Sequence, residues 1–268
     1  MDFILELIVN FALQMLFTLG FIFLFGKVIT LCNARFYKNF GSRGHAVCIA
    51  TGFIGTPVHE ASHALMCLIF GHKITEIKFF QPNSSDGTLG YVSHSYNPKN
   101  LYQKIGNLFI GIAPILIGFL ILGGLLYLLL PEMFGDVLRE LDQVDFISDF
   151  GQSFVYIGKA FVNMFSYIAS WQWWVFLLIG SFIGLHMTLS KADMQGALSG
   201  IIVFLLLFLT VDLILLLIKR NFLISFTNAI LTFGIFLLFF FCLFLLIAVV
   251  LLVLVYKCGQ EKSNNLYY

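Results

Sequence analysis

The feature that most restricts the fold of this chain is an apolar segment, Ala46 to Phe70, that carries the motif His59-Glu60-Ala61-Ser62-His63. Apart from Glu60, this segment contains no charged side chain. On a helix, residues four apart project from one face, so the two imidazoles would lie one turn apart on the same side. A carboxyl group and two imidazoles are costly to bury unless they find partners. A divalent metal ion would satisfy all three, and we therefore predict a metal site on this helix.

The spacing H-E-x-x-H also predicts which metal binds and how each residue acts. Two imidazoles four apart on a helix typically hold Zn²⁺, and the Glu beside the first can act as a base toward water. We therefore predict that His59 and His63 are zinc ligands and that Glu60 is the catalytic base.

A catalytic zinc needs a third protein ligand and an open position. We predict Asp193, which follows the end of an apolar segment and has Gly196 beside it to permit close packing. Two alternatives stay open. Asp193 could instead cap the helix that follows it, and His186 could supply the third ligand or a supporting contact. Asn107 could donate a hydrogen bond to a substrate carbonyl or hold two helices together.

Composition places the chain in the membrane. It is 60% hydrophobic and 11% charged, with a mean hydropathy of +0.95, which excludes an ordinary soluble domain. The apolar runs are long and continuous, as in membrane helices, and do not alternate as barrel strands do. The net charge of +1 and five scattered cysteines indicate neither a nucleic-acid partner nor a disulfide framework.

The predicted fold is an all-α polytopic membrane protein with about six transmembrane helices and a small β-hairpin after the H-E-x-x-H helix. The first span has a polar stripe of Asn10, Gln14 and Thr18 that is expected to face other helices. No basic region or cleavage site precedes it, so we expect it to be retained. The single membrane domain, 1–268, contains predicted spans at about 3–31, 45–70, 105–130, 173–189, 197–218 and 222–256.

Three further stretches of the sequence predict local structure. A short basic loop with Arg35, Lys38 and Arg43 is predicted after the first span. In the second span, Gly52, Gly55 and Pro57 are expected to bend or break the helix just before the motif. The acidic segment 131–170 is predicted to form one or two amphipathic helices at an interface.

The strand-like loop 71–100 follows the motif directly. Residues 73–80 and 88–96 read as two strands around a Pro-Asn-Ser-Ser-Asp-Gly turn. The edge of such a hairpin could pair with an extended substrate backbone, or the segment could be a plain connecting loop. His94, in the second strand, could be a site residue, but we favour a position at the surface.

Together these features resemble the site-2 protease family of intramembrane zinc metalloproteases. The resemblance covers about Gly52 to Gly196 and depends mainly on H-E-x-x-H. It implies that His59, His63 and Asp193 bind zinc and that Glu60 is the base. The family's late motif is usually an Asp-Gly pair, whereas here Gly196 follows Asp193 by three residues.

The resemblance implies a zinc metalloendopeptidase, a multi-pass protein of a bacterial cell membrane. It would hydrolyse a peptide bond in or near a transmembrane segment of a membrane-protein substrate. The alternative is a non-proteolytic metal-binding membrane protein, either a transporter or a scaffold. A transporter is expected to carry acidic or His residues on several spans, whereas here they gather on one span and at Asp193, with Asp212 alone elsewhere.

Overall fold

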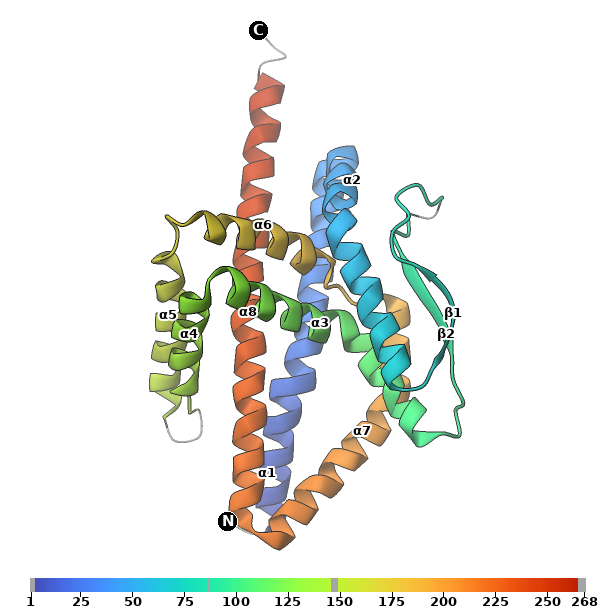
Figure 1. The fold of residues 1–268 in the computed structure, drawn as a ribbon, viewed down its shortest axis with the longest axis vertical. Coiled ribbons are helices and arrows are strands. Elements are labelled where there is room, and N and C mark those ends of the chain that lie inside the picture. The colour runs from blue at the N-terminus through green and yellow to red at the C-terminus, as the bar shows by residue number, and fades with distance from the viewer. Residues whose placement is uncertain (1–2, 86, 146–148, 265–268) are drawn as a thin grey trace.

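The computed structural model describes residues 3–85, 87–145 and 149–264. In this part the chain is helical, with one two-stranded sheet directly after the H-E-x-x-H helix, as predicted (Figure 1). In chain order the elements are α1 (Phe3–Met15), the π-helical turn η1 (Leu16–Gly20), α2 (Phe21–Ile69), β1 (Lys73–Lys78), β2 (Tyr91–Ser95), α3 (Leu101–Leu129), α4 (Pro131–Asp142), α5 (Phe150–Phe165), α6 (Trp171–His186), α7 (Lys191–Ile218) and α8 (Arg220–Asn264).

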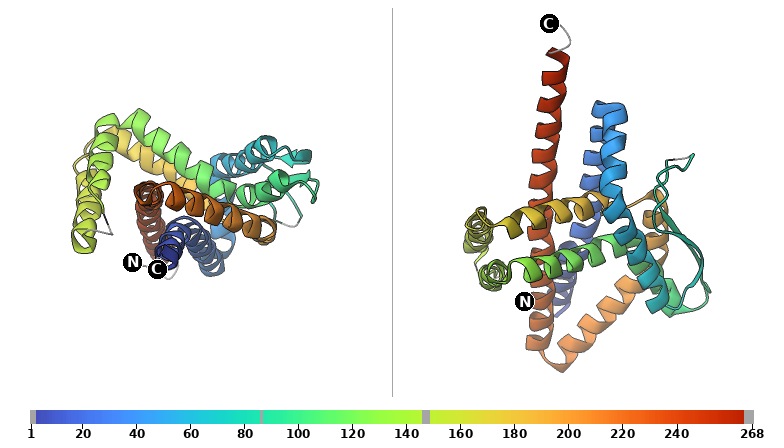
Figure 2. Two further views of the ribbon diagram at one scale, coloured as in Figure 1. Left: turned by 90° about the horizontal axis from the view of Figure 1, so that it is seen from below. Right: turned by 45° about the horizontal axis from the view of Figure 1, so that its top comes forward.

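Four helical stretches are long and apolar enough to cross a membrane: Phe3–Phe36, Leu101–Leu129, Lys191–Ile218 and Arg220–Leu243. The half of α2 that carries the motif is not among them, and α6 is a shorter apolar helix. The four stretches do not run parallel to one another, since α3 lies at a steep angle to α8 (Figures 1 and 2). The shorter helix α6 runs beside α3. The count of six spans therefore stays a prediction.

The predicted basic loop after the first span is wrong, because the helix continues through it. The first limb of α2 extends to Gly41, where φ is 50° and ψ is −123°. A positive φ costs glycine little because it has no Cβ. The second limb of α2 begins there and leads back down toward the motif (Figure 1).

Buried polar groups join α1 to α7 and α8. The side-chain amide of Gln14 donates to Asp212 Oδ1 at 3.0 Å and to Thr227 Oγ1 at 2.9 Å. All three side chains are fully buried. Asn10 and Thr18 bond to carbonyls of their own helix. The polar stripe thus contacts other helices through Gln14.

Glycines let α3 and α7 approach closely, and α7 brings Asp193. A Cβ on Gly111 would lie 2.4 Å from the Asp193 carbonyl oxygen, and one on Gly200 would lie 2.6 Å from the Lys104 carbonyl oxygen. Because neither backbone atom can move aside easily, only glycine permits this crossing. The crossing sets the start of α7 against α3.

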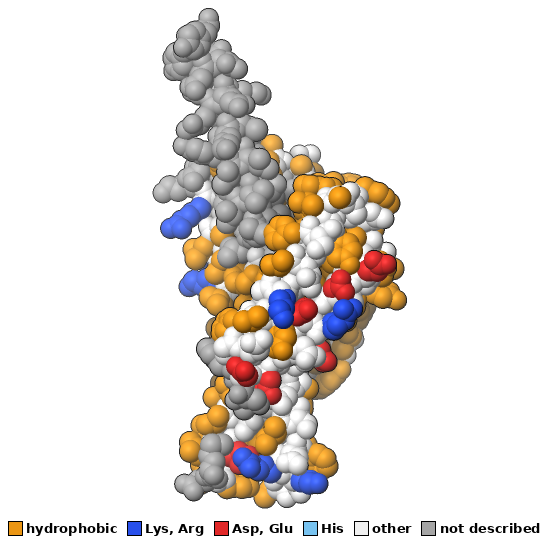
Figure 3. All heavy atoms as spheres, turned by 90° about the vertical axis from the view of Figure 1, so that its left-hand side faces the viewer, with side chains coloured by type: hydrophobic (Ala, Val, Ile, Leu, Met, Phe, Trp, Pro, Cys, Tyr) orange, Lys and Arg blue, Asp and Glu red, His pale blue; other side chains and the backbone are white. Residues whose placement is uncertain are grey.

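The acidic segment forms two helices, α4 and α5, that pack against each other. The buried face of α4 consists of Met133, Val137 and Leu141, spaced four residues apart as on one face of an amphipathic helix. Its other face carries charged side chains, including an Arg139–Asp136 pair at 3.0 Å. The space-filling view shows charged side chains among apolar ones on this side of the molecule (Figure 3).

The two strands pair antiparallel, with Lys78 opposite Tyr91 and Lys73 opposite Ser95. A register shift between Ile74 and Glu76 marks a bulge, which increases the twist of the ribbon. A backbone bond from Gln81 to the Leu89 carbonyl, 2.7 Å, continues the pairing past the strands. The hairpin lies beside the second limb of α2 (Figures 1 and 2).

Candidate metal centre

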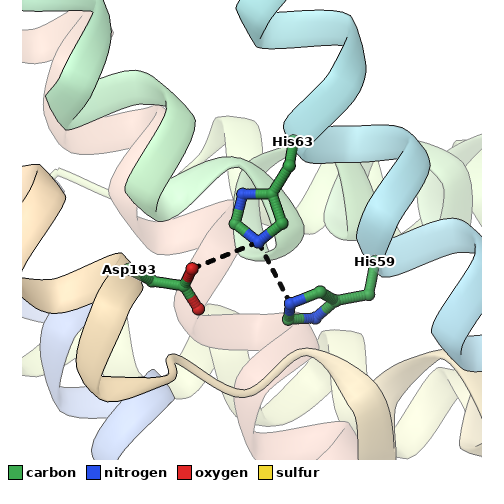
Figure 4. A group of neighbouring side chains, drawn as sticks. All are labelled: His59, His63 and Asp193. Carbon is green, nitrogen blue, oxygen red and sulfur yellow. Dashed lines mark hydrogen bonds and ion pairs between the residues drawn. The ribbon is translucent and has the colours of Figure 1, made fainter. Parts of the chain in front are cut away.

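Three side chains from two helices meet at one point: His59 and His63 of α2, and Asp193 in the first turn of α7 (Figure 4). One ligand atom from each lies within 4.8 Å of the others. The two Nε2 atoms are 3.1 Å apart, and His63 Nε2 is 3.3 Å from Asp193 Oδ1. The i, i+4 spacing accounts for the pair of imidazoles, and the α3–α7 crossing accounts for the carboxylate.

Backbone carbonyls fix the protonation of both rings. Nδ1 of His59 lies 2.7 Å from the His186 carbonyl oxygen, and Nδ1 of His63 lies 2.7 Å from the Ile110 carbonyl oxygen. A carbonyl oxygen can only accept, so each Nδ1 must carry the proton and donate it. In a neutral ring the Nε2 atom is then left with a lone pair.

This arrangement fits a divalent cation. Two Nε2 lone pairs at 3.1 Å repel each other, and the nearby carboxylate oxygen adds a negative charge. A metal ion among the three atoms would convert that repulsion into coordination. Imidazoles whose other nitrogen donates to a carbonyl are the usual arrangement for His ligands. The part of the chain that the structure describes offers one such group of metal-ligating residues.

Asp193 caps α7, as one interpretation of its sequence context predicted, and its carboxylate also reaches the imidazoles, as the ligand interpretation requires. Its Oδ2 accepts from the Ser190 amide at 2.7 Å, and its own amide donates to Ser190 Oγ at 3.1 Å, which forms a capping box. Its Oδ1 faces His63. The cap holds the carboxylate in one orientation, so one oxygen stabilises the helix while the other faces the imidazoles.

Glu60 lies in a cavity of about 500 Å³ that the triad also lines. The side chain is 6% exposed. Gly90 of the hairpin packs against it, since a Cβ there would lie 2.8 Å from Glu60 Cγ. The cavity brings together Glu60, the triad, hairpin residues 88–92 and His94, and residues from the starts of α3 and α7.

His186 is close to the triad, but its ring faces another direction. Nε2 is 3.0 Å from Thr51 Oγ1, and Nδ1 is 3.4 Å from Thr56 Oγ1. The Thr51 hydroxyl donates to its own helix, so it accepts from His186. The ring is thus engaged with two hydroxyls of α2, while the His186 carbonyl orients His59. Asn107 donates to Ser199 Oγ at 2.8 Å, joining α3 to α7, and also lines the cavity.

The glycines before the motif do not interrupt the helix. Within α2, the non-helical dihedral angles are at Gly41, and the helix continues through Pro57. Of the expected bend or break before the motif, the break is therefore wrong. Gly55 instead permits close packing, because a Cβ there would lie 2.3 Å from the Phe182 carbonyl oxygen of α6. This contact brings the end of α6, and hence the His186 carbonyl, against the motif.

Two groups at the site were missed from the sequence. The carbonyls of Ile110 and His186 orient the rings of His63 and His59, but every residue has a carbonyl, so no sequence signal distinguishes them. For His94 the sequence favoured the surface over the site, but the residue is half-buried and lines the cavity. Cys67 is fully buried and lies outside the metal-ligating group.

Comparison of this chain with protein-family models, with curated proteins and with solved structures finds no match in any of the three.

Proposed function

We propose that this protein is an intramembrane zinc metalloprotease of the site-2 type. It hydrolyses a peptide bond in or near a transmembrane segment of a membrane-protein substrate. The observation that carries the proposal is the convergence of His59 Nε2, His63 Nε2 and an Asp193 carboxylate oxygen within 4.8 Å, beside a buried glutamate in the same cavity. A metal site with an adjacent carboxylate base is an arrangement that can hydrolyse an amide.

His59, His63 and Asp193 would hold the zinc ion, which when bound polarises a carbonyl and makes water a stronger acid. Glu60 accepts a proton from the attacking water and later delivers it to the leaving nitrogen. The C–N bond breaks, a C–O bond forms, and Glu60 ends as it began. The capped Asp193 and the carbonyl-bound imidazoles keep their positions throughout.

The hairpin gives the substrate a place to bind. Residues 88–92 and His94 line the cavity, so the sheet turns β2 toward the triad. A peptide bond inside a helix is shielded by its own hydrogen bonds, so the substrate must unwind locally before hydrolysis. The released backbone groups then need partners, and a strand edge offers them.

The test is cleavage of a membrane peptide by purified protein, with and without a chelator, in wild type and in Glu60→Gln. We expect wild type to cleave the peptide without the chelator and not with it, and we expect Glu60→Gln to keep the metal but not cleave. Glu132→Gln, which changes an exposed carboxylate of α4, is the matched control and should cleave normally. Cleavage by Glu60→Gln would contradict the proposal, and zinc movement across vesicles without cleavage would favour a transporter.

A further inference from the structure

A second pair of histidines lies beside the triad. His72 follows the end of α2, and His94 lies in β2. Their Nδ1 atoms are 3.0 Å apart. His72 is buried and also stacks on Tyr96, with ring centres 5.1 Å apart and planes 12° from parallel. This contact ties the hairpin to the end of the motif helix.

A backbone carbonyl sets the protonation of both rings. His72 Nε2 lies 2.8 Å from the Gln103 carbonyl oxygen, which can only accept. Neutral His72 therefore carries its proton on Nε2 and offers a lone pair at Nδ1. His94 must then donate its Nδ1 proton to His72, so the Nε2 atom of neutral His94 is an acceptor.

The Nε2 acceptor of His94 points away from His72. In the described part of the chain, the bond to His72 is the one hydrogen bond of the His94 ring. The two ring nitrogens point in widely different directions, so Nε2 faces away from the anchoring contact. His94 lines the cavity that contains Glu60 and the triad, but it is not among the three residues grouped for metal binding. It is therefore placed to contact a bound molecule in the cavity.

A substrate helix that unwinds before cleavage offers hydrogen-bond donors to the Nε2 atom of His94. Local unwinding frees backbone N–H groups, and an N–H left unpaired out of water costs about 1–3 kcal/mol. We propose that His94 is a substrate-binding residue whose Nε2 accepts a hydrogen bond from a backbone N–H of the unwound substrate. His72 is the positioning residue that holds the ring. This inference rests on the proposed proteolytic function.

Burial lowers the pKa of His94, and the neighbouring His72 and His63 lower it further. The ring is thereby kept neutral near pH 7, with Nε2 available as an acceptor. The pKa supports the assignment, which stands on the hydrogen bonds and the cavity.

Two substitutions separate the nitrogens of His94. The amide of His94→Asn replaces the Nδ1–H donor toward His72 but leaves no acceptor in the cavity. The amide oxygen of His94→Gln replaces the Nε2 acceptor and gives up the bond to His72. Both are made in the Glu60→Gln background, so that binding is measured without turnover. The probe is a synthetic transmembrane peptide with a central Asn-Gly pair, in detergent micelles with zinc present.

We expect His94→Asn to raise the Kd of the probe roughly tenfold and His94→Gln to stay within about threefold of the parent. Metal content should be the same in both, whereas the melting temperature of His94→Gln should be somewhat lower because buried His72 loses its donor. A second probe series replaces single amide N–H groups near the centre with ester oxygens. One ester position should weaken binding roughly tenfold in the parent and leave the Asn variant unaffected.

The outcomes distinguish this inference from the proposed function. If wild type cleaves the probe in a metal-dependent way but His94→Asn binds it as tightly as the parent, the role of His94 is overturned and the protease stands. The same conclusion follows if every ester weakens parent and variant alike. If the zinc-loaded protein neither binds nor cleaves the probe, both are overturned.

Discussion

His59 and His63 face each other through their Nε2 atoms at 3.1 Å, while a backbone carbonyl holds each Nδ1 at 2.7 Å. The carbonyls belong to different segments, one at the end of α6 and one in α3. Two lone pairs held this close are unfavourable by themselves. The fold therefore constrains both imidazoles in the form that binds a cation, and the predictions below follow from that constraint.

Asp193 is predicted to hold the metal as well as cap α7. Asp193→Ala should lower zinc affinity by more than about 100-fold, the upper end of losses seen when only an outer-shell partner is removed. Ser190→Ala is the matched control, because it removes the bond to the Asp193 amide but leaves the carboxylate. It should cost about 1 kcal/mol of stability and keep the metal. Isothermal titration and thermal unfolding measure the two effects; equal zinc affinities in both variants would refute the ligand role.

His186 is predicted to support the site without binding the metal. In His186→Ala the two hydroxyl contacts with Thr51 and Thr56 are lost, but the carbonyl that orients His59 remains. We expect one metal per chain, and a loss of about 1–2 kcal/mol in the free energy of unfolding. Metal analysis beside chemical denaturation tests this. Should His186→Ala release the metal while Asp193→Ala keeps it, the two roles must be exchanged.

The close crossing of α3 and α7 is predicted to matter for the metal. Gly111→Ala places a methyl 2.4 Å from the Asp193 carbonyl oxygen, so the two helices must separate. We expect a loss of about 1–3 kcal/mol in stability and weaker zinc binding, because Asp193 moves with α7. Gly124→Ala, on the same helix but with no atom within 4 Å of the added methyl, is the control and should be neutral or stabilising. Normal zinc binding by a folded Gly111→Ala protein would count against this account.

The polar cluster on α1, α7 and α8 is predicted to be structural. Asp212 Oδ1 accepts from Gln14, whereas Oδ2 has no hydrogen-bond partner among the described residues. Asp212→Asn keeps an acceptor for Gln14 and removes a buried acid, so its melting temperature should be equal or higher. Asp212→Ala leaves the Gln14 amide with one partner fewer and should cost about 1–3 kcal/mol. Zinc content should be unchanged in both, and its loss would place Asp212 in the site.

Most of the helices could be predicted from the sequence, because long continuous apolar runs mark them. The hairpin was also predictable, since alternating residues flank a turn rich in Pro, Asn and Gly. The end of the first helical limb was not, because Arg35 and Lys38 suggested a loop, whereas the helix continues to Gly41. The role of Gly55 was misread for a similar reason. A glycine can break its helix or allow another helix to pack closely against it. At Gly55 the close packing of α6 shows that the second applies.

The meeting of His59 and His63 was predictable because its geometry is local, with one helical turn between two imidazoles. Asp193 was inferred from the need for a third ligand, and its meeting with His63 depends on the crossing of α3 and α7, which no local pattern encodes. The Ile110 carbonyl and the position of His94 depend in the same way on contacts between distant segments. Contacts of this kind form only when distant segments pack together, so the sequence pattern does not predict them.

The most direct test is the metal content of the purified protein, measured by elemental analysis for wild type and for His59→Ala, His63→Ala and Asp193→Ala. The account predicts about one zinc per wild-type chain and little or none in the two histidine variants, with a reduced amount in Asp193→Ala. A wild-type protein without zinc, or a histidine variant with a full complement, would contradict it.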